Sequence, residues 1–118
     1  REAPSRIVIN GLLMRGASVM AYDPVALDEA RKIYEGNSEI EFNDNPLNVL
    51  DDAEALIILT EWKTFRSPDF VSMRSRLRKA IIIDGRNLYD PADMMSYGFE
   101  YISIGRASVT GTNNRESR

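Results

Sequence analysis

Apolar and polar positions follow two periods along this chain, and each period predicts a different element. Continuous apolar runs predict buried strands at residues 17–22, 39–42, 53–60, 80–84 and 100–104. Apolar residues three or four positions apart predict helices at residues 4–16, 23–34, 47–50, 67–77 and 90–98. Strands that alternate with helices in this way predict a Rossmann-like layered α/β fold, with a mainly parallel sheet and helices on both faces.

Proline and glycine mark the ends of these elements. Four helix starts carry an Asx or Ser cap followed by proline, at Asp23-Pro24, Asn45-Pro46, Ser67-Pro68 and Asp90-Pro91. Gly16 follows the first helix where a left-handed cap is expected. Few apolar residues occur in 107–118, which predicts a flexible tail behind a single domain of residues 1–106.

The amino-acid composition limits the catalytic and ligand-binding groups that the chain can supply. The 118-residue chain has no cysteine and no histidine, which excludes a thiol nucleophile, a disulfide, the commonest metal ligand and the usual general base. Its net charge of −3 gives no bulk attraction to nucleic acid, and no apolar run approaches the ~20 residues of a membrane span. Neither a Gly-rich phosphate loop nor a metal-ligand cluster is present. We therefore expect no metal, nucleic acid or membrane partner, and a binding domain or one part of a larger enzyme.

Ligands of open parallel sheets bind beyond the carboxyl ends of the strands. At the first such end, Asp23 either hydrogen-bonds a ribose or caps the next helix, and Pro24 favours the cap. At another, Glu61 and Trp62 either line a pocket or are a surface acid beside a packed ring, and we favour packing. Arg1 stands near a helix N-terminus, where it needs an anionic partner unless it is a disordered terminal residue, the interpretation we favour for an isolated chain.

The stretch Asp84 to Asn87, "DGRN", is the strongest candidate because it ends an isoleucine-rich strand abruptly. Gly85 allows a positive φ or a close backbone approach. Arg86 offers a planar fork of donors that suits a phosphate or a carbonyl edge, and Asp84 can hold that fork in one orientation. From the residues alone, a ligand site and a solvated strand end with a local ion pair both stay open.

Five segments in order carry a resemblance to a known family: "REAPS", "GASVMAYDPVA", "DDAEALIILTEWKTFR", "IIIDGRNLYD" and "GFEYISIGR". Together they resemble the C-terminal UDP-sugar-binding domain of the UDP-glucose/GDP-mannose dehydrogenase family, over nearly all of residues 1–106. The phrases "AYDP", "LTEW", "DGRN" and "IGR" favour its UDP-glucose branch.

The resemblance implies a reaction and two site residues. The family oxidises the sugar's C6 alcohol to a carboxylate in two NAD-dependent steps, through a thiohemiacetal on a cysteine. It implies that Arg86 contacts the UDP-sugar and that Arg1 reaches the NAD bound mainly by an N-terminal domain. Asp23 and Glu61 match family phrases without a ligand role. The implied partners are the UDP-sugar, the rest of the dehydrogenase polypeptide and further copies in a cytoplasmic homo-oligomer.

Three family features are absent from the chain. They are the Gly-rich NAD fingerprint, the catalytic cysteine, and the strand ending in Phe-Lys that precedes "REAPS". We therefore expect an excerpt or cleaved piece of a longer protein, without catalytic residues of its own and inactive alone. With the first strand of the domain missing, we expect a rearranged sheet, or pairing with another copy or with the missing segment.

Two alternative functions stay open. One is a stand-alone nucleotide-binding or assembly module without catalysis. The other is a phospho-acceptor domain of similar layered shape that uses Asp23 or Asp84.

Overall fold

A computed structural model describes residues 2–23, 27–60, 68–103 and 109–110. The chain divides into two compact units, Arg1–Val49 and Leu50–Arg118. The short 3₁₀ helix η1 (Asn48–Leu50), predicted after Asn45-Pro46, crosses the boundary between them. That the whole of residues 1–106 acts as one domain stays a prediction.

The first unit contains α1 (Glu2–Met14), β1 (Val19–Ala21), α2 (Leu27–Ile33) and β2 (Ile40–Phe42). The two strands pair in parallel, with Val19 opposite Ile40. Gly16 ends the α1 region with a φ of 88°, which confirms the left-handed cap. The predicted start of α2 includes Pro24, which lies outside the described residues.

Helix α1 has the apolar face that its sequence predicts. Val8, Ile9, Leu12 and Leu13 are half-buried, whereas Met14 is 84% exposed. The hydroxyl of Tyr34, just after α2, donates to Asn10 Oδ1 of α1 at 3.0 Å. The Tyr34 ring also lies 6.2 Å from the Phe42 ring of β2. Apolar packing, side-chain hydrogen bonds and the pairing of β1 with β2 therefore hold this unit together.

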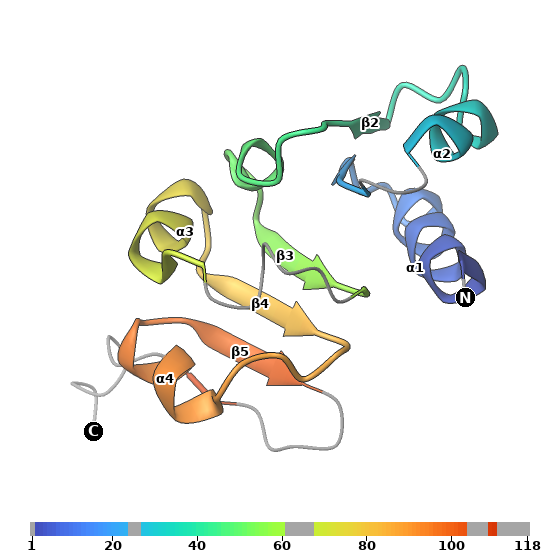
Figure 1. Ribbon diagram of the computed structural model, residues 1–118. Helices are drawn as coiled ribbons and strands as arrows, with labels where there is room; N and C mark the ends of the chain where they lie inside the picture. Colours follow the sequence, from blue (N-terminus) through green and yellow to red (C-terminus); the bar gives the residue numbers. More distant parts are fainter. Residues whose placement is uncertain (1, 24–26, 61–67, 104–108, 111–118) are drawn as a thin grey trace. The chain divides into compact units, whose positions relative to one another are not determined.

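The second unit contains β3 (Ala55–Ile58), α3 (Phe70–Arg76), β4 (Ile81–Asp84), α4 (Pro91–Ser96) and β5 (Glu100–Ser103). Its three strands form a parallel sheet in the order β3-β4-β5 and point the same way in Figure 1. All five elements were predicted, and Asp90 caps α4 as its Asp-Pro pair indicates. The layered α/β prediction is confirmed.

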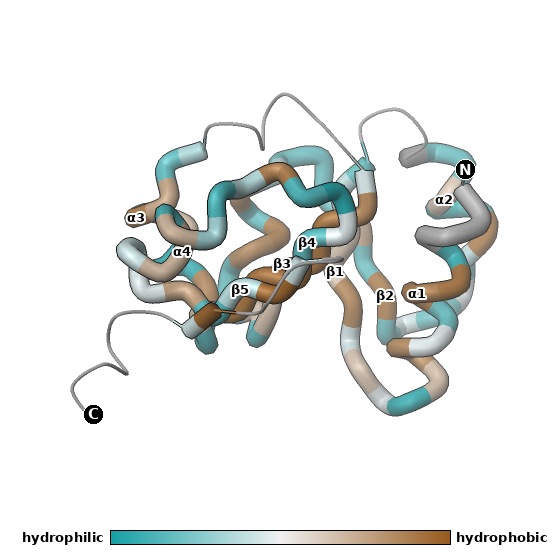
Figure 2. Tube along the Cα trace, turned by 90° about the horizontal axis from the view of Figure 1, so that it is seen from below, coloured by the Kyte–Doolittle hydropathy of each residue, from teal (hydrophilic) through white to brown (hydrophobic). Residues whose placement is uncertain are grey.

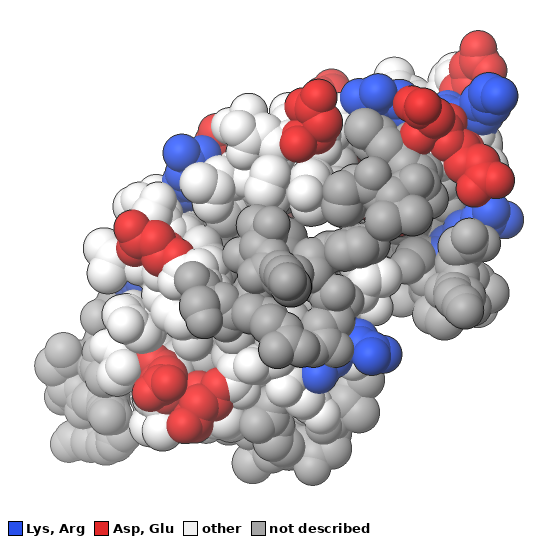
Figure 3. Space-filling model, viewed as in Figure 1, with Lys and Arg blue, Asp and Glu red and all other residues white. Residues whose placement is uncertain are grey.

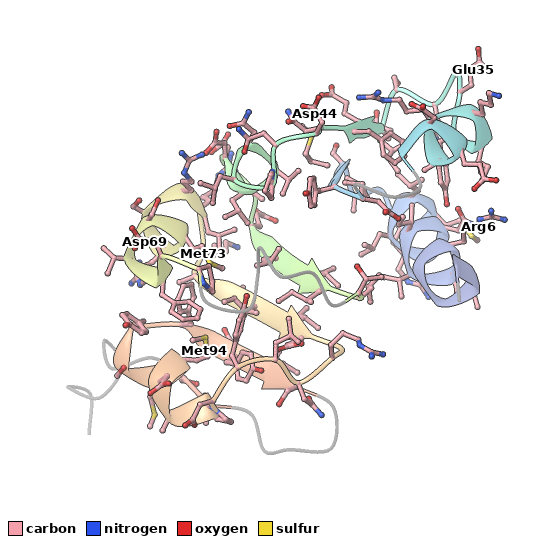
Figure 4. All side chains as sticks on the ribbon, viewed as in Figure 1. Arg6, Glu35, Asp44, Asp69, Met73 and Met94 are labelled. Atoms are coloured by element: carbon pink, nitrogen blue, oxygen red, sulfur yellow. The ribbon has the colours of Figure 1, made fainter. Side chains whose placement is uncertain are left out.

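One face of this sheet is the core of the second unit. Much of the sheet is coloured as hydrophobic in Figure 2. The inward residues are buried along all three strands: Leu56, Ile58, Ile82, Asp84, Tyr101 and Ser103. Met73 of α3 and Met94 of α4 are fully buried on the helical side of this core (Figure 4). The opposite face is apolar but less buried, and Ile83 there is 37% exposed. Continuous apolar strands thus enclose a carboxylate, Asp84, within the packed face.

The described strands form two parallel sheets, β1-β2 and β3-β4-β5. In the doubly wound order 3-2-1-4-5-6, removing strand 1 leaves these same two groups of strands. The topology therefore agrees with the Rossmann-like order without its strand 1. Rearrangement of the sheet, or pairing with another copy or with the missing segment, stays a prediction.

One residue of the predicted flexible tail, Val109, is paired with the sheet. Val109 pairs with Tyr101 in an antiparallel bridge, with backbone N–H···O distances of 2.9 and 3.1 Å. This bridge covers part of the outer edge of β5. Residues 111–118 lie outside the described part, so the flexible tail there stays a prediction.

The cap of α3 differs from the prediction. Asp69, not Ser67, is the N-cap, and its Oδ1 accepts from the Ser72 backbone N–H at 3.1 Å. Ser67 lies outside the described residues. Asp69 follows Pro68 and immediately precedes the helix, so it meets the same need for a cap two residues later in the chain. Figure 4 shows Asp69 at the start of α3.

We expect Asp69→Ala to lower the free energy of unfolding by about 1 kcal/mol, because it leaves the Ser72 N–H without its cap. Urea denaturation measures the change. Asp44→Ala, at an exposed turn residue, is the matched control and should stay within about 0.5 kcal/mol of the unmodified chain. Equal losses in both variants would show that Asp69 does not act as a cap.

Candidate functional site

The loop after β4 is built around the buried carboxylate of Asp84. This side chain is completely shielded from solvent. Its Oδ1 accepts from the backbone N–H of Arg86 at 2.9 Å, and its Oδ2 accepts from that of Leu88 at 2.7 Å. Such a carboxylate folds the chain back on itself in place of regular secondary structure. Asp84 thus explains why the isoleucine strand ends where it does.

Tyr101 of β5 completes this arrangement. Its hydroxyl lies 2.7 Å from Asp84 Oδ2 and 3.2 Å from the carbonyl oxygen of Tyr89. Since a hydroxyl has one proton and the shorter contact is to the carboxylate, we assign its donation to Asp84. The hydroxyl oxygen in turn accepts from the Tyr89 backbone N–H at 3.3 Å. One buried hydroxyl therefore joins the beginning of the loop to its end.

These contacts set the loop backbone. The Gly85 N–H donates to the Ile58 carbonyl at the end of β3, at 2.8 Å. The positive φ in this loop is at Asn87, at 55°, and not at Gly85, where the sequence allows it. Asn tolerates this left-handed conformation better than most residues, and the hydrogen bonds on either side of it hold it there.

Arg86 lies at the exposed part of the loop, and its own backbone N–H is held by Asp84 Oδ1. The prediction that Asp84 orients the guanidinium needs correction, because the carboxylate holds the backbone N–H of Arg86. Asp84 has both oxygens committed to protein donors, including Tyr101, inside the core. That burial also argues against Asp84 as a phospho-acceptor. The arrangement offers a cation on a preorganised loop at the carboxyl end of a parallel strand, where such folds bind ligands.

The remaining candidates contribute less to this site. Asp23 is half-buried just beyond β1, in the first unit. Arg1, Glu61 and Trp62 lie outside the described residues. Among the described residues, no cluster of three acidic side chains suits a metal ion.

Charge is mixed on the surface. Acidic and basic side chains are interspersed among the described residues on the face seen in Figure 3. No helix in the described part of the chain is long and apolar enough to cross a membrane.

Tyr89 is buried just after the loop, and its phenol makes the free energy of unfolding depend on pH. Burial raises the pKa of Tyr89 above its usual value of 10.0, and the nearby Asp84 carboxylate adds to the rise. The folded chain therefore keeps this proton at a pH where the unfolded chain has lost it. The free energy of unfolding consequently falls as the pH rises above about 10, by at most ~1.4 kcal/mol per pH unit from this group.

We expect Tyr89→Phe to flatten that decline between about pH 10 and 11.5, because phenylalanine has no proton to retain. Urea unfolding at stepped pH values measures the slope. Tyr97→Phe is the matched control, since Tyr97 is 42% exposed, and should retain the slope. An unchanged slope in Tyr89→Phe would contradict the assignment.

The parallel sheet, with a preorganised loop at the carboxyl end of β4, is typical of the layered α/β class of ligand-binding domains. The sequence profile of the UDP-glucose/GDP-mannose dehydrogenase family, UDP binding domain, matches residues 1–91. The chain belongs to this family and corresponds to its C-terminal UDP-sugar-binding domain.

Individual relatives support this family assignment. The UDP-glucose 6-dehydrogenase of Pseudomonas aeruginosa is 42% identical over 109 residues, 90% of this chain and 24% of that protein. The UDP-glucose 6-dehydrogenase TuaD of Bacillus subtilis is 38% identical over 112 residues, 95% of this chain and 24% of its own length. This chain thus spans about a quarter of these relatives.

A solved structure supports the fold. The NDP-N-acetyl-D-galactosaminuronic acid dehydrogenase from Methanosarcina mazei Go1 superposes with a TM-score of 0.72 at 34% identity, over 90% of this chain and 21% of that one. The Rossmann-like prediction is therefore confirmed by shape as well as by sequence.

Proposed function

We propose that this chain binds the nucleotide sugar in a UDP-glucose 6-dehydrogenase, with Arg86 as its ligand contact. The observation that carries the proposal is the loop after β4, where a buried Asp84 fixes the backbone and Arg86 is exposed. A guanidinium presents several donors in one plane, which suits a diphosphate or a carbonyl edge of the base. Two UDP-glucose 6-dehydrogenases among the relatives support UDP-glucose as the ligand.

Chemistry in this proposal belongs to the rest of the enzyme. When bound there, NAD would supply the hydride-accepting chemistry for oxidation of the sugar alcohol. The described residues of this chain hold no Gly-rich phosphate loop, so their role is to bind and orient the nucleotide. Arg1 is the chain's proposed contribution toward NAD, and it lies outside the described residues. We also propose that the whole enzyme is a homo-oligomer in the cytoplasm.

A titration of the chain with UDP, followed by backbone amide NMR, tests the ligand. We expect the largest shifts at the amides of Gly85, Arg86 and Asn87, because they lie on the proposed contact loop. The amide of Glu35, in an exposed turn before β2 and so at the amino end of that strand, serves as the internal reference. A dispersed spectrum that ignores UDP up to millimolar concentration would contradict a binding site carried by this chain alone.

A further inference from the structure

We infer that Tyr101 is a positioning residue for the nucleotide-sugar site, because its buried hydroxyl ties together the two ends of the loop that carries Arg86. The inference rests on the function proposed above for Arg86. Tyr101 acts through the loop and makes no ligand contact of its own, since its side chain is completely buried.

The sheet register brings this hydroxyl to the loop. Tyr101 stands opposite Ile82 in the β4-β5 pair, two positions before the pair formed by Asp84 and Ser103. Side chains two positions apart share one face of a strand, so the phenol extends along the buried face toward Asp84. Its ring lies 6.2 Å from that of Tyr89, which begins the segment after the loop.

Four residues, Gly85 to Leu88, separate the two points that the hydroxyl joins. At one point Asp84 Oδ2 accepts from both Tyr101 and Leu88, and at the other the Tyr89 N–H donates to Tyr101. Without the hydroxyl, the carboxylate keeps one donor on Oδ2 and the Tyr89 N–H loses its acceptor. Both groups lie in the protein interior, where such losses favour a rearranged loop.

A loosened loop weakens binding without altering Arg86 itself. Asn87 holds a left-handed backbone conformation that few side chains favour in isolation. Once the hydrogen bonds around it are fewer, the loop has other conformations available, and the ligand must order the loop on binding. The hydroxyl of Tyr101 therefore contributes to the affinity for the nucleotide sugar without touching that ligand.

Steady-state kinetics of the whole dehydrogenase carrying this chain test the inference through Tyr101→Phe, Arg86→Ala and the double variant. We expect Tyr101→Phe to raise the KM for UDP-glucose roughly tenfold, with kcat within about twofold. In the Arg86→Ala background, Tyr101→Phe should add less than about twofold, because the loop no longer carries the contact that it positions. Tyr97→Phe, at an exposed tyrosine of the same unit, is the matched control and should leave the KM unchanged.

The outcomes separate this inference from the function proposed for Arg86. If Arg86→Ala raises the KM but Tyr101→Phe does not, the positioning role is overturned while the role of Arg86 stands. If the two effects multiply in the double variant, Tyr101 acts on general stability and the inference is again overturned. If Arg86→Ala leaves the KM unchanged, the proposed ligand contact itself fails, and the inference with it.

A second variant tests the same connection from its other end. Asp84→Asn keeps the volume and the Oδ1 acceptor for Arg86, but its amide nitrogen in place of Oδ2 cannot accept from Tyr101 or Leu88. We expect the same roughly tenfold rise in the KM for UDP-glucose. In the Arg86→Ala background, Asp84→Asn should again add less than about twofold. An Asp84→Asn enzyme with the unmodified KM would overturn the inference.

Discussion

Replacing Arg86 by alanine is expected to raise the KM of the whole dehydrogenase for UDP-glucose by about 10- to 100-fold, with a much smaller effect on kcat. The physical reason is the loss of one charge-assisted contact, which costs about 1.5–3 kcal/mol. The proposed contact is to the nucleotide, which does not change during oxidation, so ground and transition states should lose it equally. Initial rates over a range of UDP-glucose concentrations measure both constants.

Arg78→Ala is the matched control for this experiment. Arg78 is also an exposed arginine of the second unit, but it precedes β4, at the opposite end of the strand from the loop. It pairs with Asp52 at 2.9 Å on the surface, a contact of small energetic value. Its replacement should leave the KM within about twofold. An unchanged KM in Arg86→Ala would remove Arg86 from the binding site.

Much of the fold could be predicted because its signals are local. The three-isoleucine run predicted β4, and Asp90-Pro91 predicted the start of α4. Both depend on neighbouring residues only: β-branched side chains favour a covered strand, and an Asp before proline favours a helix start. The division of the strands between two sheets follows from which strand is absent, and the resemblance supplied that information.

The interior of the site could not be predicted from the sequence, because it depends on contacts between distant residues. Asp84 and Tyr101 are 17 positions apart, and only the β4-β5 register brings them to 2.7 Å. The sequence carries one partial signal. A tyrosine on the inward side of a buried strand needs a polar partner, and the strand before it ends in an acid.

Local sequence left the position of the positive φ in this loop open. Gly85 allowed a positive φ or a close backbone approach, and the structure gives the positive φ to Asn87. The carboxylate of Asp84 accepts from residues 86 and 88, and these two hydrogen bonds force the turn onto the residue between them. These local side-chain hydrogen bonds thus decided which of two permissive residues took the left-handed conformation.

Replacing Asp84 by alanine is expected to lower the free energy of unfolding by about 3 kcal/mol or more. The substitution removes the Asp84 acceptor from the backbone N–H groups of Arg86 and Leu88, and it leaves the Tyr101 hydroxyl only its longer contact to the Tyr89 carbonyl oxygen, at 3.2 Å. A buried donor without an acceptor costs about 1–3 kcal/mol, and neighbouring losses do not add fully. Since domains of this size are stable by only about 5–15 kcal/mol, urea denaturation should show a large shift of the midpoint.

Asp93→Ala provides the contrast, because Asp93 is an exposed acid in the first turn of α4 and should cost less than about 1 kcal/mol. Equal stabilities of Asp84→Ala and Asp93→Ala would mean that the loop finds other acceptors, so that Asp84 does not fix its backbone. A large loss in Asp84→Ala alone would show that the carboxylate serves the fold first. The buried carboxylate that ends β4 would then also hold the backbone of the loop on which Arg86 faces a ligand.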